Sequence, residues 1–461
     1  MKKFLLSLSF VIFLVGKINA QQQLNLPLLS NWDDNSLPVF AFGSYNDCWG
    51  YAAPDGREYA IVGAINGTLF FDVTDPTNPV LISYEPGKDS GGVHRDYKTY
   101  QHYAYGVCDE GNSSLQIWDL QYLPDSVVKV YDSDQFSTRC HNIFISDDKL
   151  FLASNTVNFS LHAMDVLSLA NPESPTFIST LTGPFWHIHD VFVRNDTAFC
   201  SAGNEGFFIY DYTNPTNPLL IQSITAYPEK GYNHSTWVSG NILVFADENH
   251  GLALKVYDIS NILSPQFLSL FRSNLLNIQP PNTSSGSIPH NPFIRNDKAV
   301  VSYYHDGVQI FDLANPSSPQ QVAYYDTYPQ NNDYNSYQGC WGVYPFLPSG
   351  NIIASDIENG LFMLDGYGVL VGTSETPDVI RQTIFPNPFK DGINIKFNGQ
   401  SKPNALKITL SDVLGKVVSV DRIQLINDIY SINTSNLQGG VYYLTIDGND
   451  YHYSSKLVKI P

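Results

Sequence analysis

One stretch decides the fold of this chain: Phe71-Asp72-Val73-Thr74-Asp75-Pro76-Thr77-Asn78-Pro79-Val80-Leu81-Ile82. The same order of residues returns as Tyr210-Asp211-Tyr212-Thr213-Asn214-Pro215-Thr216-Asn217-Pro218-Leu219-Leu220-Ile221. An apolar segment that ends near an Asp, a turn rich in Pro and Asn, and a second apolar segment indicate two consecutive β-strands. The stretch is therefore a candidate repeat unit.

Seven such units follow one another along the chain. Each contains an Asp after an apolar or aromatic residue, and the last unit is shortened; these are Asp72, Asp119, Asp165, Asp211, Asp258, Asp312 and Asp365. A His or Trp stands 22 to 25 residues before each Asp, and these markers are Trp49, His94, His141, His189, His234, His290 and Trp341. Repeats of 45 to 56 residues are typical of propeller blades rather than of independent domains.

Each unit divides into four short strands. In the fourth unit they are expected at residues 189–194, 197–201, 207–212 and 219–224, with turn residues between them. The seventh unit lacks a fourth strand, and residues 24–32 resemble a fourth strand with no unit before it. The sequence therefore predicts an all-β fold, a seven-bladed β-propeller over 21–366 in which residues 24–32 complete the last blade. An open array of the same units fits the two chain ends less well.

Composition and the N-terminus indicate an exported protein. Of 461 residues, 43% are hydrophobic and only 15% charged, and the net charge of −19 argues against nucleic acid as a partner. Residues 1–20 have the basic start, short apolar core and small-residue end of a signal peptide. No later segment has the length and apolarity of a transmembrane helix. Five cysteines, an odd number, leave at least one thiol unpaired and form no CxxC motif.

The repeat stops after Asp365, and residues 367–379 are expected to be a linker. Residues 380–461 contain Phe385-Pro386-Asn387-Pro388-Phe389, then Leu410-Ser411-Asp412-Val413-Leu414-Gly415-Lys416, then Leu437-Gln438-Gly439-Gly440-Val441-Tyr442-Tyr443-Leu444. This order resembles the type A sorting domain of the type IX secretion system. The resemblance implies a small Ig-like β-sandwich, recognition by the type IX machinery, and a cell-surface or secreted location. It also implies removal of the domain, with release of the cargo or its attachment to surface lipopolysaccharide.

The propeller region has a resemblance of its own. Its units, with Asp before Asn-Pro-x-x-Pro, are similar to the LVIVD-type repeats of the choice-of-anchor B family. The second and fifth units depart from that pattern, since Asp119 and Asp258 are not followed by Asn-Pro. The family implies an architecture and a location but no chemistry.

The seven marker residues are the candidate ligand-binding residues. The first strand of each blade lines the channel of a propeller, so these markers should meet at one channel mouth: Trp49, His94, His141, His189, His234, His290 and Trp341. Acidic residues in the turns between second and third strands should lie at the same mouth, among them Asp109-Glu110, Glu205 and Asp247-Glu248. The two indoles are expected side by side where the ring closes.

Two interpretations of the five histidines stay open. His94, His141, His189, His234 and His290 are candidate ligands of a transition metal such as zinc, copper or iron. Alternatively each imidazole pairs with a carboxylate and fixes its blade, which a residue repeated once per blade favours.

Two insertions, 273–287 and 328–338, are rich in Asn, Ser, Pro and Tyr and are expected to be loops on the histidine face. No motif for a nucleophilic, phosphate-binding or zincin mechanism is present, so no catalytic residue is assigned and enzymatic activity stays open. The sequence favours a surface or secreted module that binds a glycan or a protein. The alternative is a metal-dependent enzyme with the histidine cluster as its metal site.

Overall fold

A computed structural model describes residues 23–40, 43–273, 286–330, 334, 336–371, 381–398, 407–412, 416–418, 423–426, 429–448 and 451–460. The predicted signal peptide, most of the insertion at 273–287 and most of the linker at 367–379 lie outside these residues. The chain divides into two compact units, Met1–Gly372 and Thr373–Pro461, and each is described by itself. Among the described residues no helix is both long and apolar enough to cross a membrane.

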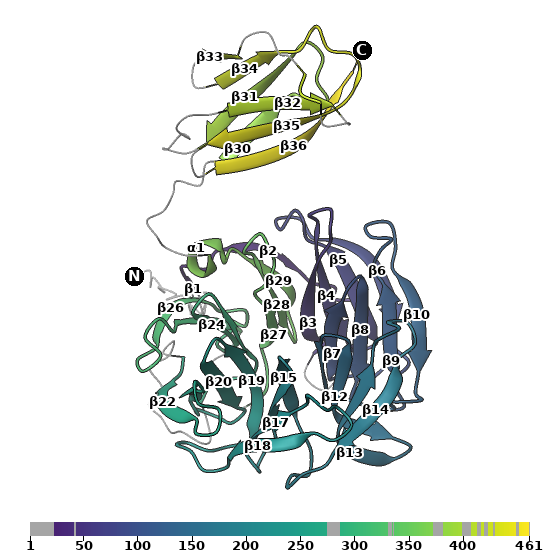
Figure 1. The fold of residues 1–461 in the computed structure, drawn as a ribbon, viewed down its shortest axis with the longest axis vertical. Coiled ribbons are helices and arrows are strands. Elements are labelled where there is room, and N and C mark those ends of the chain that lie inside the picture. Colours follow the sequence, from purple (N-terminus) through teal and green to yellow (C-terminus); the bar gives the residue numbers. More distant parts are fainter. Residues whose placement is uncertain are drawn as a thin grey trace, which may run out of the picture. The chain divides into compact units, whose positions relative to one another are not determined.

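The first unit consists of seven antiparallel sheets around a channel (Figure 1). The strands of the first three sheets, in chain order, are β3 (Tyr45–Ala52), β4 (Glu58–Ala64), β5 (Gly67–Asp72) and β6 (Val80–Pro86); β7 (Arg95–Tyr100), β8 (Tyr103–Cys108), β9 (Leu115–Asp119) and β10 (Val128–Ser133); and β11 (Asn142–Ser146), β12 (Lys149–Val157), β13 (Ser160–Ser168) and β14 (Thr176–Leu181).

The remaining four sheets follow the same order from the channel outward. Their strands are β15 (Asp190–Arg194), β16 (Thr197–Ser201), β17 (Phe207–Asp211) and β18 (Leu219–Ile224); β19 (Asn233–Ser239), β20 (Ile242–Asp247), β21 (Leu254–Asp258) and β22 (Gln266–Phe271); β23 (Pro292–Arg295), β24 (Lys298–Ser302), β25 (Val308–Asp312) and β26 (Gln320–Tyr325); and β27 (Cys340–Tyr344), β28 (Ile352–Asp356) and β29 (Gly360–Leu364) with β2 (Leu28–Trp32). The predicted all-β, seven-bladed propeller is confirmed.

The repeated Asp has a local structural reason. Asp72 accepts the backbone N–H of Thr74 at 2.9 Å, and Asp211 accepts that of Thr213 at 2.8 Å. A carboxylate that binds the backbone two residues later closes a turn, which ends the third strand and reverses the chain toward the fourth. The Asp repeats because each blade needs this turn at the same place.

The third blade departs from this pattern. Asp165 lies inside β13 and not at its end, where it binds Nδ1 of His162 at 2.8 Å. Ser168 takes the turn position, since its Oγ accepts the N–H of Ala170 at 3.2 Å. In this blade the turn after the third strand is therefore closed by the hydroxyl of Ser168, three residues after Asp165, and not by a carboxylate.

The ring closes through the N-terminal strand β2. It pairs antiparallel with β29, and Ser30 donates a hydrogen bond to the carbonyl oxygen of Pro76 in the first blade at 2.5 Å. Ser179 and Ser269 make the same bond to Pro215 and Pro316 of the blades that follow theirs, at 2.6 and 2.7 Å. Strand β2 thus makes the contact of a fourth strand between the seventh and first blades.

The residues before β2 lie in a different sheet. Strand β1 (Gln23–Leu24) pairs with β26 and adds a fifth strand to the sixth blade. Asn25 then turns the chain with a φ of 50°, and Leu26 is buried between the sixth and seventh blades. The segment 24–32 therefore links two blades: only Leu28–Trp32 belongs to the seventh.

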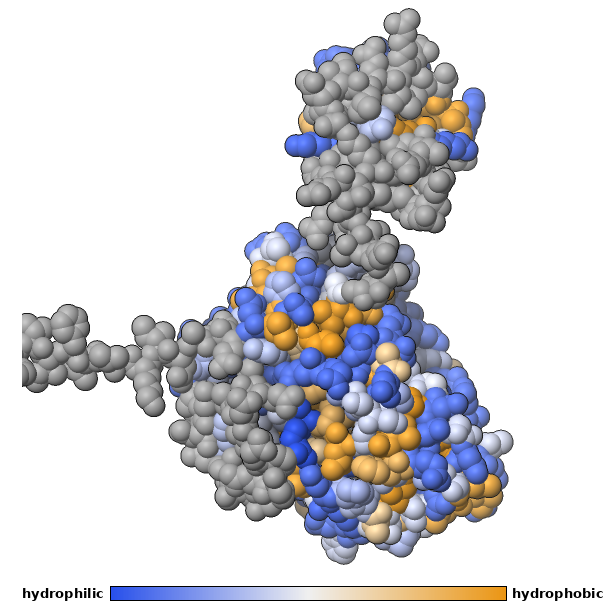
Figure 2. Space-filling view, turned by 90° about the vertical axis from the view of Figure 1, so that its left-hand side faces the viewer, coloured by the Kyte–Doolittle hydropathy of each residue, from blue (hydrophilic) through white to orange (hydrophobic). Residues whose placement is uncertain are grey.

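The outer strands leave apolar side chains in solvent. Val80, Leu219 and Leu220 at the starts of β6 and β18 are 52%, 58% and 50% exposed. Figure 2 shows one side of the molecule, on which hydrophobic residues form groups between hydrophilic ones. Except in the sixth blade, where β1 pairs with β26, the fourth strand is the outermost layer, so its outward residues have nothing to pack against.

The chain leaves the propeller through a short helix, α1 (Tyr367–Leu370), whose Leu370 is buried in the core of the first unit. The second unit is a small β-sandwich, as predicted. Its two sheets are formed by β30 (Arg381–Phe385), β31 (Gly392–Asn398), β34 (Ile429–Asn433) and β33 (Ile423–Ile426), and by β32 (Lys407–Asp412), β35 (Gly440–Gly448) and β36 (Tyr451–Lys459). Ile395, Leu410 and Leu444 are among the residues of its core.

Candidate functional site

Six of the seven marker residues form a closed circle at one mouth of the channel, here called the histidine circle: His94, His141, His189, His234, His290 and Trp341. The distances between successive ring centroids are 5.4, 4.1, 4.1, 4.4, 5.1 and 5.1 Å, the last one from Trp341 back to His94. Each blade from the second to the seventh contributes one ring, because each residue stands at the inner strand of its blade.

Trp49 is not part of the histidine circle. It is the fifth residue of β3, which begins at Tyr45, whereas each histidine of the circle stands within two residues of the start of its strand. Its Nε1 donates to Oγ1 of Thr99 at 3.2 Å, and its ring packs 4.8 Å from that of Tyr344. The expected pair of indoles is absent, since Trp341 lies between His94 and His290.

A cavity of about 500 Å³ stands over the histidine circle and is here called the mouth pocket. Besides the circle, its lining contains two amides, three phenols, one carboxyl and one aliphatic residue: Asn204, Asn249, Tyr232, Tyr304, Tyr337, Glu248 and Val93. The volume is within the range of small-molecule sites. Tyr337 belongs to the insertion at 328–338, so one predicted mouth loop does contribute to the lining.

Hydrogen bonds fix which nitrogen of each imidazole carries the proton. Nδ1 of His189 donates to the carbonyl oxygen of His234 at 3.1 Å, and Nδ1 of His290 donates to that of Trp341 at 2.6 Å. A carbonyl oxygen only accepts, so the proton of the neutral ring lies on Nδ1 and Nε2 keeps its lone pair.

Carboxylates orient two further rings. Nδ1 of His141 binds Oδ2 of Asp109 at 2.8 Å, and Nδ1 of His94 binds Glu110. The expected partnership of imidazole and carboxylate through Nδ1 therefore holds for two histidines of the circle, not for all five. In His189 and His290, Nδ1 donates to a backbone carbonyl oxygen instead. The position of a carbonyl group cannot be predicted from a sequence motif.

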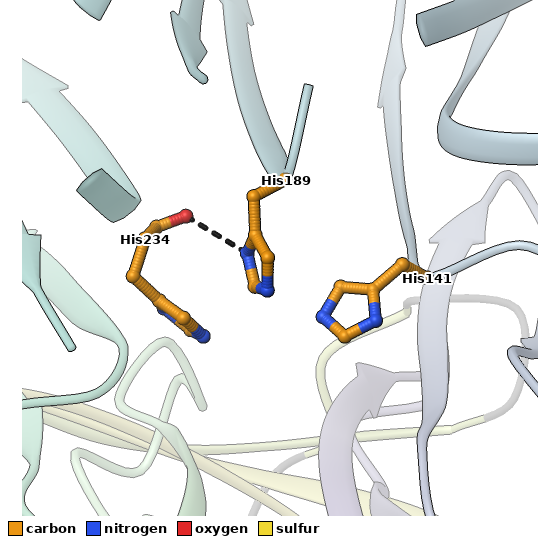
Figure 3. Close-up of side chains that lie close together, drawn as sticks. All are labelled: His141, His189 and His234. Atoms are coloured by element: carbon orange, nitrogen blue, oxygen red, sulfur yellow. Dashed lines mark hydrogen bonds between the residues drawn. The ribbon is translucent and has the colours of Figure 1, made fainter. Parts of the chain in front are cut away.

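Two groups of donors are close enough to share an ion. His141, His189 and His234 present nitrogen atoms that all lie within 4.8 Å of one another (Figure 3). His234, Glu248 and His290 form a second group that meets the same limit. In the second group, Nε2 of His234 is 3.6 Å from Oε2 of Glu248, and Nε2 of His290 is 4.0 Å from Oε1.

Burial keeps most of these imidazoles neutral. It lowers the pKa of His189 and of His234 well below the usual value, with further lowering from neighbouring imidazoles. Burial lowers the pKa of His290 to about 3. His141 differs: burial lowers its pKa, but the hydrogen bond and charge of Asp109 outweigh this and raise it. Burial also raises the pKa of Glu248 to about 7.

Below the histidine circle the channel is nearly filled. Asp47, Asp96 and Asp190 line two small cavities of about 30 and 20 Å³, each with room for one or two water molecules. Further down, Trp237 packs between Phe192 and Phe293, at centroid distances of 4.6 and 4.9 Å. The mouth pocket therefore has a floor, and small molecules meet the histidine circle from its open side.

Asp247, which was expected at the mouth, and several other polar residues do not line the mouth pocket and have other partners. Asp247 binds Nζ of Lys255 at 2.9 Å, and Asp306 accepts the hydroxyl of Tyr334 at 2.8 Å. His187 binds the hydroxyl of Tyr232 at 2.7 Å, which places it beside the pocket. His250 binds the carbonyl oxygen of Gly286 at 2.9 Å and is not a lining residue.

The sequence did not single out the three tyrosines of the lining. Tyr232 stands directly before β19, Tyr304 lies in the turn between β24 and β25, and Tyr337 precedes β27. They occupy different positions in their blades, so no repeat spacing marks them.

Two segments of the chain match known protein families. Residues 230–271, the fifth blade, match the LVIVD repeat, and residues 383–460 match the secretion system C-terminal sorting domain. No curated protein matches the chain. Among solved structures, the computationally designed Ika8 protein is 10% identical, covers 70% of this chain and 96% of its own, and has a TM-score of 0.44.

The Cps50 (Swd1) β-propeller domain of Myceliophteria thermophila is also 10% identical. It covers 71% of this chain and 99% of its own, with a TM-score of 0.49. The sorting domain implies export through the type IX secretion machinery, to the cell surface or beyond. The chain thus contains a match to the LVIVD repeat within its β-propeller and a C-terminal sorting domain of the type IX secretion system.

Proposed function

We propose that the protein is an exported metalloprotein, whose propeller holds a transition-metal ion at the channel mouth and binds a small ligand on that ion. The observation that carries the proposal is the group of His141, His189 and His234, with donor nitrogens within 4.8 Å of one another. This group lies at the floor of the mouth pocket, where a ligand reaches it.

The hydrogen bonds favour a metal over purely structural histidines. Nδ1 of His141 and of His189 is occupied by an oxygen acceptor, which is the arrangement that orients metal-binding imidazoles. The nitrogens of the three rings face one common space (Figure 3). Nε2 of His189 keeps its lone pair, which a shared cation would bind.

The three imidazole nitrogens limit which metal ions the site would bind. Imidazole nitrogen suits zinc, copper, iron and nickel, whereas magnesium and calcium prefer oxygen. Three protein ligands leave at least one position of a four-coordinate ion open. That position faces the mouth pocket and would accept a donor atom of the ligand.

The lining of the mouth pocket favours an uncharged ligand. No Lys or Arg is among its described lining residues, while Glu248 lies inside and Asp109 and Glu110 lie behind His141 and His94. These carboxylates would offset the charge of the bound cation, so the pocket would offer little net attraction to an anionic group. Tyr304, Tyr337 and Trp341 offer aromatic faces and hydroxyls, which suits the hydroxyl-bearing rings of a glycan.

If the sorting domain is removed after export, the propeller remains as the functional part of the protein. The first compact unit ends at Gly372, and it has a buried core of its own that includes Leu26 and Leu370. Cleavage between the units would therefore not open the propeller core. We expect the mature protein at the cell surface or in the medium to contain the propeller without residues 383–460.

Metal analysis of the full chain, purified without a His tag, tests the proposal. Wild-type protein should contain transition metal in stoichiometric amount, and the double variant His141→Ala/His234→Ala should contain none. His102→Ala is the matched control, since His102 lies outside the histidine circle and should leave the metal content unchanged. A folded wild-type protein that neither contains metal nor takes up Zn²⁺ or Cu²⁺ would refute the proposal.

A further inference from the structure

The histidine circle has more donors than one ion uses. It offers five imidazoles, and Glu248 adds a carboxylate against His234 and His290. A four-coordinate ion with an open position takes three protein ligands. Building on the proposed function, we propose that the mouth pocket holds two metal ions side by side, the second bound by His234, His290 and Glu248.

The size of the circle excludes a single central ion. Successive rings are 4.1 to 5.4 Å apart, so rings on opposite sides of a six-membered circle are separated by about twice that distance. A metal–imidazole bond is only about 2.0–2.1 Å long. One ion therefore reaches neighbouring imidazoles but not opposite ones, and the donors on the other side remain available.

The two donor groups overlap at one residue, His234. Its Nε2, which faces Glu248, has one lone pair and serves one ion at a time. With a single ion bound, His234 completes the group of three histidines. When the second ion binds, His234 would join His290 and Glu248, and the first ion would keep His141 and His189.

Each half of the circle has its own negative charge. Glu110 and Asp109 lie behind His94 and His141, so two carboxylates compensate the first ion. Glu248 compensates the second ion directly, and the hydroxyl of Tyr304 donates to it at 2.6 Å and holds it in place. Two cations close together need such separate compensation, because their mutual repulsion is strong in a buried site.

A pair of ions changes what the pocket can bind. Two ions about 3.5–4 Å apart bind two oxygen atoms of one ligand, or polarise a single bridging oxygen. A ligand with adjacent hydroxyls, as in a sugar ring, matches two open positions. The second ion thus adds selectivity for neighbouring oxygen donors within the same pocket.

Titration of the metal-free full chain with Zn²⁺ tests the inference. Wild-type protein should bind two ions per chain, the second more weakly, and Glu248→Gln should bind one. Glu173→Gln is the matched control: Glu173 accepts the hydroxyl of Tyr103 on the outside of the third blade and should leave two ions bound. His290→Asn should also bind one ion, and circular dichroism with thermal unfolding confirms that the variants are folded.

The stoichiometry separates the two proposals. One ion per wild-type chain at saturating Zn²⁺ overturns the second site but leaves the proposed function intact. No bound ion overturns both. Two ions in the folded Glu248→Gln variant would also overturn the assignment of the second site. With Co²⁺ in place of Zn²⁺, the wild-type signal in electron paramagnetic resonance should show magnetic coupling, which Glu248→Gln should abolish.

Discussion

His189 donates its Nδ1–H to the carbonyl oxygen of His234 at 3.1 Å, and the two imidazole rings lie 4.1 Å apart between centroids. One blade thereby sets the proton position and the orientation of the ring in its neighbour. The same relation links His290 to Trp341 at 2.6 Å. Backbone carbonyls of the propeller thus aim lone pairs into its channel mouth.

Asp109→Asn should weaken metal binding without removing a ligand. Asp109 binds Nδ1 of His141 at 2.8 Å, and loss of such an orienting carboxylate typically costs 10–100-fold in metal affinity. Competition with a chelator measures the affinity, and Asp55→Asn on the surface is the control. Equal affinities of wild type and Asp109→Asn would show that His141 is not a ligand.

His290→Gln should change the pH dependence of stability in the metal-free protein. Burial lowers the pKa of His290 to about 3, below the usual value of about 6.5 in the unfolded chain. Between these values the unfolded chain binds the extra proton, so the wild-type free energy of unfolding falls as the pH falls.

The contribution of His290 is about 1.4 kcal/mol per pH unit within that window. Glutamine does not titrate, so the variant should lose less stability on acidification than the wild type. Urea unfolding at several pH values between 4 and 6.5 in the presence of a chelator measures the difference. Parallel curves for the two proteins would contradict a buried, neutral His290.

Trp49→Ala and Trp341→Ala should separate stability from binding. Trp49 packs against Tyr344 and lies under Nζ of Lys98 at 4.3 Å, so its loss should destabilise the propeller by about 3 kcal/mol or more. The metal affinity of the Trp49→Ala variant should equal that of the wild type. Trp341→Ala removes a wall of the mouth pocket between His94 and His290 and should weaken ligand binding. If Trp49→Ala weakened ligand binding and Trp341→Ala only lowered stability, Trp49 and not Trp341 would be the residue that lines the mouth pocket.

Ser30→Ala tests the ring closure. It removes the hydrogen bond to the carbonyl oxygen of Pro76 and should cost about 0.5–1.5 kcal/mol of stability. Ser179→Ala and Ser269→Ala remove the equivalent bonds between other blades and should cost similar amounts. Trp32→Ala, which removes a ring 4.7 Å from Phe71 of the first blade, should cost more. If the β2 variants matched wild type in urea unfolding, β2 would not hold the ring together.

Truncation after Val371 should leave the propeller folded but retained in the cell. The first unit has its own core, and the sorting domain at 383–460 is the part that implies export. The truncated chain should unfold at the same temperature and bind the same metal as the full chain. Fractionation of cells that express both forms should find only the full-length form exported.

The repeat predicted the fold because the propeller has one local rule per blade. The Asp turn ends each third strand, so Asp72 and Asp211 mark blades in the sequence. The strands of the fourth blade agree with the expected ranges to within one residue. The third blade does not follow this rule, because Ser168 closes its turn in place of an Asp. The spacing of the repeat does not reveal this replacement.

The site was predictable as far as it depends on the repeat. The spacing of His141, His189 and His234 placed their imidazoles on one channel mouth, where the structure brings them together. The structure places Trp49 outside the histidine circle, since β3 begins four residues before it, whereas the other first strands begin within two residues of their markers. Tyr304 and the carbonyl acceptors follow from tertiary structure, which a spacing does not encode.

In the proposed site, imidazoles from several blades together bind one metal ion. X-ray absorption at the zinc edge of the wild-type protein loaded with one equivalent of Zn²⁺ tests it most directly. A site built from imidazoles should show only nitrogen and oxygen neighbours at about 2.0–2.1 Å, with the outer scattering pattern of three imidazoles. His141→Ala/His234→Ala should retain no zinc and therefore give no such pattern. Sulfur neighbours at about 2.3 Å, or a spectrum with one imidazole or none in the wild type, would contradict the account.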